Sequence, residues 1–353
     1  MTQETTAEST INRLESRLKT LQSDALFTRD RENLAETDAL LTALPGRVAG
    51  LRARRYAYKA TFEERIADLA KSWPAAQRQA NGNLQIQATA VRDDCARAAE
   101  AVGRLVSLKR SPLTAAKPTI DRVDQTLDEV EKRVAALQRT VASTYEPLQK
   151  EVQSLEREVK QCERNMDWLD GASFQLNAGE SLVEATEARL LEGEGDDGME
   201  GILFATDQRL LFERREKVAR KKVLFITTSS ELVKELRWEA PLNEIETLEA
   251  SEARKLLSKR ELLAITPASG SAAPPARFRL ETDSDEWRAL LLRCKSGDID
   301  AARDASAPPV KDYLVPAKCP TCGGAQGKAG RVRGTSAIRC EYCGATIVLE
   351  EAG

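Results

Sequence analysis

Four cysteines near the end of the chain have the type and spacing of metal ligands. Cys319 and Cys322 form a first pair with two residues between the thiols, and Cys340 and Cys343 repeat that spacing. Two intervening residues let one tight turn direct both sulfurs at the same ion, and two such turns supply the four corners of a tetrahedron. The spacing therefore predicts one structural zinc ion. With four thiolates and no open position, we expect no catalysis at the metal.

The residues around these cysteines resemble a zinc ribbon of the CPxCG-knuckle type. Gly323 and Gly344 follow the second cysteine of each pair. We expect these glycines to let the backbone fold round the metal without a clash at Cβ. The resemblance implies two β-arms, at 337–339 and 345–349, in a module that spans 317–353. A module of this size buries little apolar surface, so the metal is expected to supply the missing stability.

The chain contains no histidine. This absence removes Ser-His and Cys-His nucleophile arrangements within the chain. The remaining cysteines, Cys95, Cys162 and Cys294, occur singly on apolar helical stripes, which is typical of buried free thiols. Carboxylates alone can do acid–base chemistry, but no pair of them stands out in the sequence. We therefore expect that the protein is not an enzyme.

The densest basic run of the chain is expected to form a loop. A protein partner or an anionic membrane could bind there, because each Lys or Arg close to such a membrane contributes about 1 kcal/mol. A solvated hairpin tip is the alternative. The cationic residues of this predicted basic loop are Arg214, Arg215, Lys217, Arg220, Lys221 and Lys222.

Helical periodicity stops at Gly171, and short β-rich runs separated by turn residues follow. We predict strands at 181–192, 201–205, 209–214, 223–228, 233–238, 245–250, 262–266 and 277–281. Asp283 and Glu286 then form a capping-box-like pair ahead of a helix with Trp287 and Leu291 on one face. Several antiparallel strands closed by one amphipathic C-terminal helix is the plan of a pleckstrin-homology-like (PH-like) barrel.

One predicted hairpin resembles that of bacterial PH-like and GRAM domains. Gly179-Glu180 precedes a strand that ends in Thr206-Asp207, and the next strand restarts at Arg209 before an aliphatic–aromatic run. Those families often have Asn where this chain has Asp207, and both residues suit a turn. The resemblance implies binding of phosphoinositides, peptides or other domains, and the fold alone does not choose among these.

Apolar residues keep heptad spacing throughout the stretch 120–169. A stripe this narrow must stay against a partner helix, and its one 4-4 step is a stutter. The stripe consists of Ile120, Val123, Leu127, Val130, Val134, Leu137, Val141, Tyr145, Leu148, Val152, Leu155, Val159, Cys162, Met166 and Leu169.

Shorter stripes precede this one, and breaks are predicted at Pro45-Gly46, Pro74, 81–83 and 111–118. We expect the helices to form an elongated antiparallel arrangement within the chain. We also expect the chain to self-associate through the coiled coil. A coiled-coil dimer between two chains is the alternative.

The bulk composition bounds the class of protein. The chain has 353 residues, of which 31% are charged and 5% aromatic, a balance typical of long solvated helices. A net charge of −3 argues against chain-wide electrostatic binding of nucleic acid. No apolar run is long enough for a membrane span, and the N-terminus lacks the layout of a signal peptide.

We therefore expect a cytoplasmic, multi-domain α+β protein. Its predicted parts are a helical coiled-coil region (1–171), a PH-like domain (172–297), a flexible linker (298–316) and a zinc ribbon (317–353). Three binding-type modules predict a non-enzymatic scaffold or adaptor for protein partners. Two alternatives stay open. A nucleic-acid-associated factor would use the basic loop together with Arg331 and Arg333 of the ribbon, and a peripheral membrane protein would place the basic loop on anionic lipid.

Overall fold

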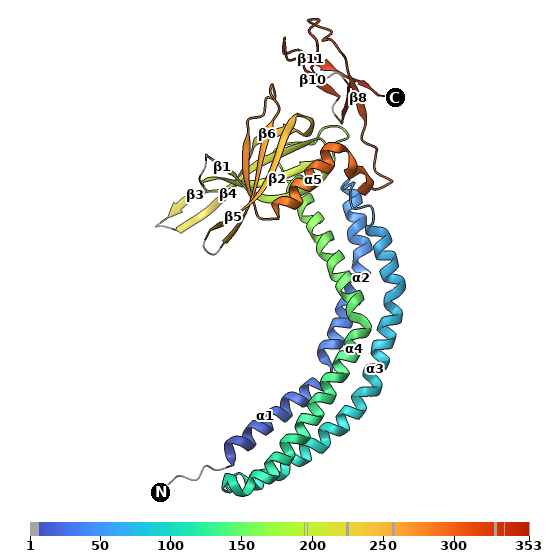
Figure 1. Cartoon of the computed structure of the whole chain (residues 1–353), viewed down its shortest axis with the longest axis vertical. Helices are drawn as coiled ribbons and strands as arrows, with labels where there is room; N and C mark the ends of the chain where they lie inside the picture. The colour runs from blue at the N-terminus through green and yellow to red at the C-terminus, as the bar shows by residue number, and fades with distance from the viewer. Residues whose placement is uncertain are drawn as a thin grey trace. The chain divides into compact units, whose positions relative to one another are not determined.

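The computed structural model describes residues 7–193, 195, 197–223, 226–255, 258–327, 330–334 and 336–352. The chain divides into two compact units. Figure 1 shows its helices and strands. The first consists of Met1–Gly46 and Glu63–Glu158, and the second of Arg47–Phe62 and Val159–Gly353. None of the described helices combines the length and the apolar character needed to cross a lipid bilayer.

Four long helices form the first part of the chain as far as the structure describes it, from residue 7 on. They are α1 (Glu8–Asp24), α2 (Thr28–Ala53), α3 (Phe62–Leu105) and α4 (Leu113–Asp170), with the short 3-10 helix η1 (Val106–Leu108) ahead of α4. Within the first unit, Arg17 on α1 forms an ion pair with Asp128 on α4. Further along both segments, the Tyr145 hydroxyl on α4 donates to Asp30 on α2 over 2.8 Å. A later residue of the α1–α2 segment contacts a later residue of α4, so α1 and α2 run parallel to α4.

The third helix runs the opposite way. Arg65, near the start of α3, pairs with Glu158 on α4 at 2.9 Å, whereas Asp94, late in α3, pairs with Arg133 of α4 at 2.7 Å. The expected antiparallel arrangement of helices within the chain is confirmed. The heptad stripe lies on the buried side of α4, and all its members except Leu137, Leu148 and Leu169 are buried.

The helix breaks expected at Pro45-Gly46, Pro74 and 81–83 are wrong. Pro45 lies inside α2 and Pro74 inside α3, and both prolines face solvent. Buried apolar residues continue on either side, for example Leu44 and Val48 around Pro45. This packing outweighs the roughly 3 kcal/mol that an interior proline costs. The chain breaks instead at 25–27, 54–61 and 106–112, the last of which overlaps the predicted break at 111–118.

Seven antiparallel strands form the sheet of the second unit. They are β1 (Leu182–Leu191), β2 (Gly198–Thr206), β3 (Arg209–Val223), β4 (Ile226–Pro241), β5 (Ile245–Lys255), β6 (Ser258–Pro267) and β7 (Ala276–Leu280). Their order in the sheet is β4-β3-β2-β1-β7-β6-β5. The ring of Trp238 on β4 nevertheless meets Phe278 on β7 with centroids 5.4 Å apart. Because these strands are not neighbours, the sheet must curl until its inner faces pack together.

A C-terminal helix closes this sheet, as the PH-like plan requires. The helix is α5 (Ser284–Ser296), followed by the 3-10 helix η3 (Asp298–Ala302), and a further 3-10 turn, η2 (Leu242–Glu244), precedes β5. The predicted cap is confirmed, because the Asp283 carboxylate accepts the N–H groups of Asp285 and Glu286. Lys295 and Arg288 of α5 donate to backbone carbonyls of β5.

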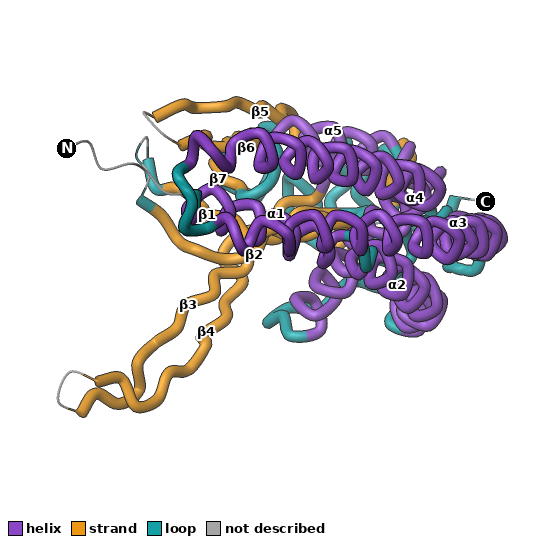
Figure 2. The backbone as a smooth tube through the Cα atoms, turned by 90° about the horizontal axis from the view of Figure 1, so that it is seen from below, coloured by secondary structure: helices purple, strands orange, loops and turns teal. Residues whose placement is uncertain are grey.

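The basic run was predicted as a loop, and this is wrong. It lies within β3, which pairs with β4 along its length. The strand predicted at 223–228 is also wrong, because β3 ends at Val223 and β4 begins at Ile226. Figure 2 shows β3 and β4 extending together beyond the other strands. Periodicity could not separate two short strands around a loop from one long hairpin.

The last part of the chain contains two small sheets. The strands are β8 (Asp312–Val315), β9 (Gly330–Arg333), β10 (Ala337–Arg339), β11 (Thr346–Val348) and β12 (Glu350–Glu351). β10 pairs with β11, which confirms the two expected β-arms, and β8 lies between β9 and β12. The segment 298–316, for which the composition predicted a flexible linker, contains η3 and β8 and contributes buried side chains to the second unit.

Candidate metal centre and the buried polar networks

The four predicted ligands lie together. The Sγ atoms of Cys319, Cys322, Cys340 and Cys343 are all within 4.8 Å of one another. Cys322 Sγ is 3.7 Å from Cys340 Sγ, and Cys319 Sγ is 3.9 Å from Cys343 Sγ. Four sulfurs bound tetrahedrally at the usual Zn–S length would be about 3.8 Å apart. A disulfide would need about 2.05 Å, so this spacing fits a shared metal ion and not a pair of disulfides.

The two knuckles have the same backbone geometry. Gly323 N–H donates to the Cys319 carbonyl, and Gly344 N–H donates to the Cys340 carbonyl, each over 2.9 Å. Both glycines have positive φ, 74° and 72°, and a Cβ on either would meet nothing within 4 Å. The expected reason for these glycines was a steric clash, and this is wrong. The knuckle needs a left-handed backbone conformation that glycine adopts without cost.

Backbone N–H groups point at the sulfurs of Cys319 and Cys340 and favour the thiolate form of each. The amides of Thr321 and Tyr342 lie 3.4 Å from the sulfurs of Cys319 and Cys340, respectively. Hydrogen bonds from the backbone at Cys343 and Tyr342 outweigh burial and lower the pKa of Cys340 to about 6. A thiolate in this position is ready to bind a metal at neutral pH.

The donor set therefore fits zinc. Cys319, Cys322, Cys340 and Cys343 would hold one ion, whose role at a closed site of four thiolates is structural. The ribbon has a small core of its own, in which two of the six buried residues are ligands. These residues are Val315, Cys319, Val332, Cys340, Ile347 and Leu349. Four thiolates at this spacing would repel one another, so a bound cation would stabilise this core.

The residues that carry the PH-like resemblance form one buried network. The Glu180 carboxylate accepts from the Thr206 hydroxyl over 2.7 Å and from Arg209 Nε over 2.9 Å. Thr206 in turn accepts the N–H of Gln208. The side chain of Glu180 is fully buried and that of Arg209 is 15% exposed. The motif thus fixes the β2–β3 turn, and in this arrangement its charges neutralise each other.

Asp207 is more than a turn residue. Its carboxylate accepts from Arg303 Nη1 and from the Tyr58 hydroxyl, both over 3.0 Å, and from the Ser181 amide over 2.9 Å. Burial raises the pKa of Asp207, although these donors oppose the shift. Sequence reasoning missed this cluster because Tyr58, Asp207 and Arg303 are far apart in the chain. We name Tyr58, Asp207 and Arg303 the buried clasp.

Two of the six cations in the predicted basic loop have described side chains, and both contact carboxylates. Arg215 Nε donates to Glu213 over 2.7 Å, and its Nη2 donates to the Trp168 carbonyl over 2.8 Å. Arg214 forms an ion pair with Glu216. The side chains of Lys217, Arg220, Lys221 and Lys222 lie outside the described residues, so a binding role for them stays a prediction.

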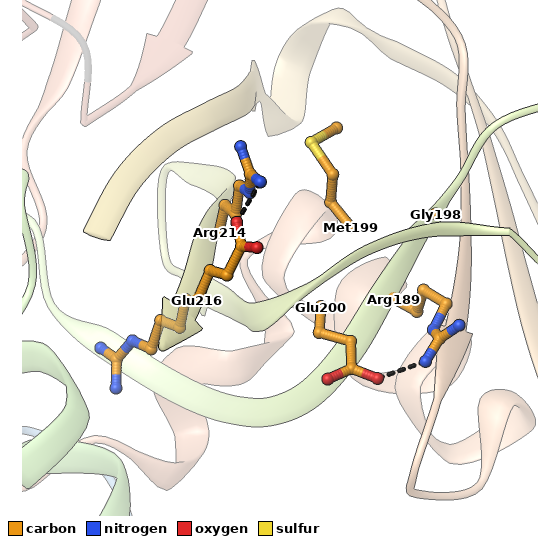
Figure 3. Close-up of a pocket in the computed structure, with 7 residues that line it drawn as sticks. Arg189, Gly198, Met199, Glu200, Arg214 and Glu216 are labelled. Carbon is orange, nitrogen blue, oxygen red and sulfur yellow. Dashed lines mark hydrogen bonds and ion pairs between the residues drawn. The ribbon is translucent and has the colours of Figure 1, made fainter. Parts of the chain in front are cut away.

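Arg214 and Arg215 also line a pocket of about 500 Å³ between β1, β2 and β3. Figure 3 shows that Arg189 in this pocket faces Glu200, just as Arg214 faces Glu216. Because both of these arginines already face a carboxylate, the pocket is not preorganised for an anion. In the ribbon, Arg333 pairs with Asp300, whereas Arg331, the other cation of the nucleic-acid alternative there, is exposed.

No protein-family model matches the chain, and no curated protein does. The chain is similar to several solved structures, among them the following three. The N-terminal PH domain of Vps36 is 17% identical, over 35% of this chain and 86% of that one, with a TM-score of 0.23. Autoinhibited Vav1 is 13% identical, over 97% of this chain and 64% of that one, with a TM-score of 0.25. The DH/PH domains of p115-RhoGEF are 11% identical, over 75% of this chain and 98% of that one, with a TM-score of 0.20.

TM-scores this low show no common arrangement of the whole chains, and no activity follows from them. The assignment of the middle domain rests on its own topology. Seven antiparallel strands, curled so that β4 meets β7 and closed by a C-terminal helix, make this domain PH-like in fold.

Proposed function

We propose that the chain is a non-enzymatic, cytoplasmic adaptor whose zinc ribbon binds a protein partner. The observation that carries this proposal is the exposure of large apolar side chains on the ribbon and on β8, the strand that pairs with β9 and β12 of the ribbon. Val348 on β11 is 79% exposed, Tyr342 in the second knuckle is 70% exposed, and Leu314 on β8 is 44% exposed. Apolar and aromatic side chains that face solvent on a small, metal-stabilised module are suited to a protein interface.

One side of the Tyr342 ring contacts the ribbon. The ring lies against the first knuckle, where a Cβ on Gly324 would come within 2.8 Å of the ring. Tyrosine has few rotatable bonds, so it loses little conformational entropy on binding. The zinc ion, bound by both knuckles, would therefore stabilise the surface that the partner recognises.

The other two modules support an adaptor in different ways. The helical bundle offers long solvated helix faces, and self-association through them is part of this proposal. In the PH-like domain, Glu180 and Arg209, the charged residues of the hairpin that resembles PH-like and GRAM domains, pair with each other. This favours a role for the domain as a scaffold, with recognition at surfaces outside that motif.

A pull-down from the native host tests the proposal. The bait would be the full-length, zinc-loaded protein, compared with a Tyr342→Ser/Val348→Ser double variant and with a chain truncated before Tyr313. Ile86→Ser provides a matched control, because Ile86 is 72% exposed on α3. We expect the double variant to keep its zinc and lose the partners, and the control to retain both.

Partners that bind the truncated chain as well as the full-length protein would contradict a binding role for the ribbon. Turnover of a nucleotide, lipid or peptide by the purified protein would contradict the non-enzymatic part of the proposal.

A further inference from the structure

A cavity of about 710 Å³ lies within the second unit. The connection between α2 and α3, the end of α4 and the segment 303–308 all contribute to its lining. This volume is in the range of small-molecule sites in proteins. Met166, Leu169, Leu176 and Leu182 form an apolar part of the wall, and such a wall suits an alkyl group.

The charged part of the lining is mainly cationic. It comprises four arginines and two carboxylates, namely Arg52, Arg54, Arg55, Arg303, Glu180 and Asp304. Glu180 is neutralised by Arg209, and Arg303 belongs to the buried clasp. Arg54 pairs with Asp170 at 2.8 Å.

The remaining cations differ in what they contact. Arg52 donates to the backbone carbonyls of Tyr56 and Tyr58 and lies 3.6 Å from Asp304. Arg55 is exposed, and within the described part of the chain its guanidinium forms no hydrogen bond or ion pair. The cavity therefore has one cation at its surface that is not neutralised by the protein.

The backbone at Arg55 would favour a different residue. The Tyr56 N–H donates to the Leu51 carbonyl over 3.0 Å, and the Arg55 N–H donates to the Arg52 carbonyl over 2.9 Å. These two bonds form a Schellman motif at the end of α2. Arg55 occupies its left-handed position with φ of 65°, where glycine is the usual residue. A role for the arginine side chain would offset the cost of this backbone conformation.

We propose that this cavity binds a small amphipathic anion, a carboxylate or phosphate group that carries a short alkyl chain. The head group binds the guanidinium of Arg55, and the chain packs against Met166, Leu169 and Leu176. A purely structural role for Arg55 would be the attraction between its charge and the carbonyl end of α2. That role requires no ligand, and the test separates the two.

Isothermal titration of the full-length, zinc-loaded protein uses four probes: decanoate, decyl phosphate, decanol and inorganic phosphate. We expect at least one decyl anion to bind about tenfold or more tightly than decanol or phosphate, because head and tail each contribute. The tighter of the two anions identifies the head group. Absence of binding by both decyl anions, or equal binding by decanol, would overturn the proposal.

Two glycine variants complete the test. Arg55→Gly relieves the backbone and should raise the midpoint of thermal unfolding, yet weaken binding of the preferred decyl anion about tenfold or more. Lys59→Gly is the control, because Lys59 has φ of 60° in the same connection and does not line the cavity. It should leave the affinity unchanged. Wild-type affinity in Arg55→Gly would refute the assignment.

Discussion

Replacing Arg303 with methionine should destabilise the second unit strongly, because it leaves a buried carboxylate without its cation. The Asp207 side chain is fully buried, that of Arg303 is 8% exposed, and their charged atoms are 3.0 Å apart. Removing one partner of such a pair costs about 3–5 kcal/mol. Methionine retains much of the arginine stem's apolar volume, so lost packing contributes little to this cost.

The matched experiment is a double-mutant cycle. Asp207→Asn keeps an acceptor for the Ser181 amide and should cost about 1–3 kcal/mol. The double variant should cost about 1–3 kcal/mol less than the sum of the two single variants. Urea denaturation, monitored by tryptophan fluorescence, measures the free energy of unfolding of Arg303→Met, Asp207→Asn and the double variant. The exposed pair Arg214–Glu216 is the control, and its coupling should not exceed about 1 kcal/mol.

Acidification gives a second readout of the same contact. Burial raises the pKa of Asp207, and Arg303 lowers it, so Arg303→Met should raise that pKa further. A carboxyl whose pKa is higher in the folded state than in the unfolded state binds extra protons on folding. The stability deficit of Arg303→Met should therefore shrink as the pH falls toward about 3.9, the ordinary Asp value. Additive single costs, or a deficit independent of pH, would refute the reasoning.

Three further predictions concern other parts of the molecule. Cys340→Ser should reduce the zinc content from about one ion per chain to none, as measured by elemental analysis, and a variant that retains the ion would contradict a site of four thiolates. Glu261 accepts hydrogen bonds from Lys259 and Ser284, and these bonds, the one from Lys259 most of all, lower its pKa to about 2. Glu261→Gln should therefore cost about 1 kcal/mol above pH 4.3, and the deficit in urea denaturation should disappear as the pH falls toward 2. Tyr145→Phe should cost about 1–2 kcal/mol, because it leaves a buried carboxylate on α2 without its donor. A thermal midpoint equal to that of the wild-type chain would contradict it.

The four-cysteine cluster and the helical seam could be predicted because both are local in sequence. Two residues between thiols determine a knuckle, and the heptad spacing from Ile120 to Leu169 determines which face of α4 is buried. The same reasoning failed at Pro45 and Pro74, where a local rule predicts a break. Packing against helices distant in the sequence keeps α2 and α3 continuous there, and no local pattern reports that packing.

The buried clasp and the cavity beside it could not be predicted. The sequence patterns place Tyr58 in the helical coiled-coil region (1–171), Arg303 in a linker and Asp207 in a turn. Each assignment fits the residue's neighbours in sequence, yet the three side chains meet in one cluster. Charge and spacing indicate a site only when its members recur at short intervals. A cluster assembled from three separate segments requires the fold itself.

The contacts of the first unit have a consequence for synthesis of the chain. Arg17 lies 107 to 114 positions before its acidic partners on α4. At about 5–20 residues per second, a ribosome takes on the order of ten seconds to deliver those partners. Trp73 of α3 needs no such wait, since it donates to Asp38 on α2, only 35 positions earlier. A hairpin of α2 and α3 can therefore form first, and its apolar residues, such as Leu44 and Leu69, are covered fully only after α4 has emerged.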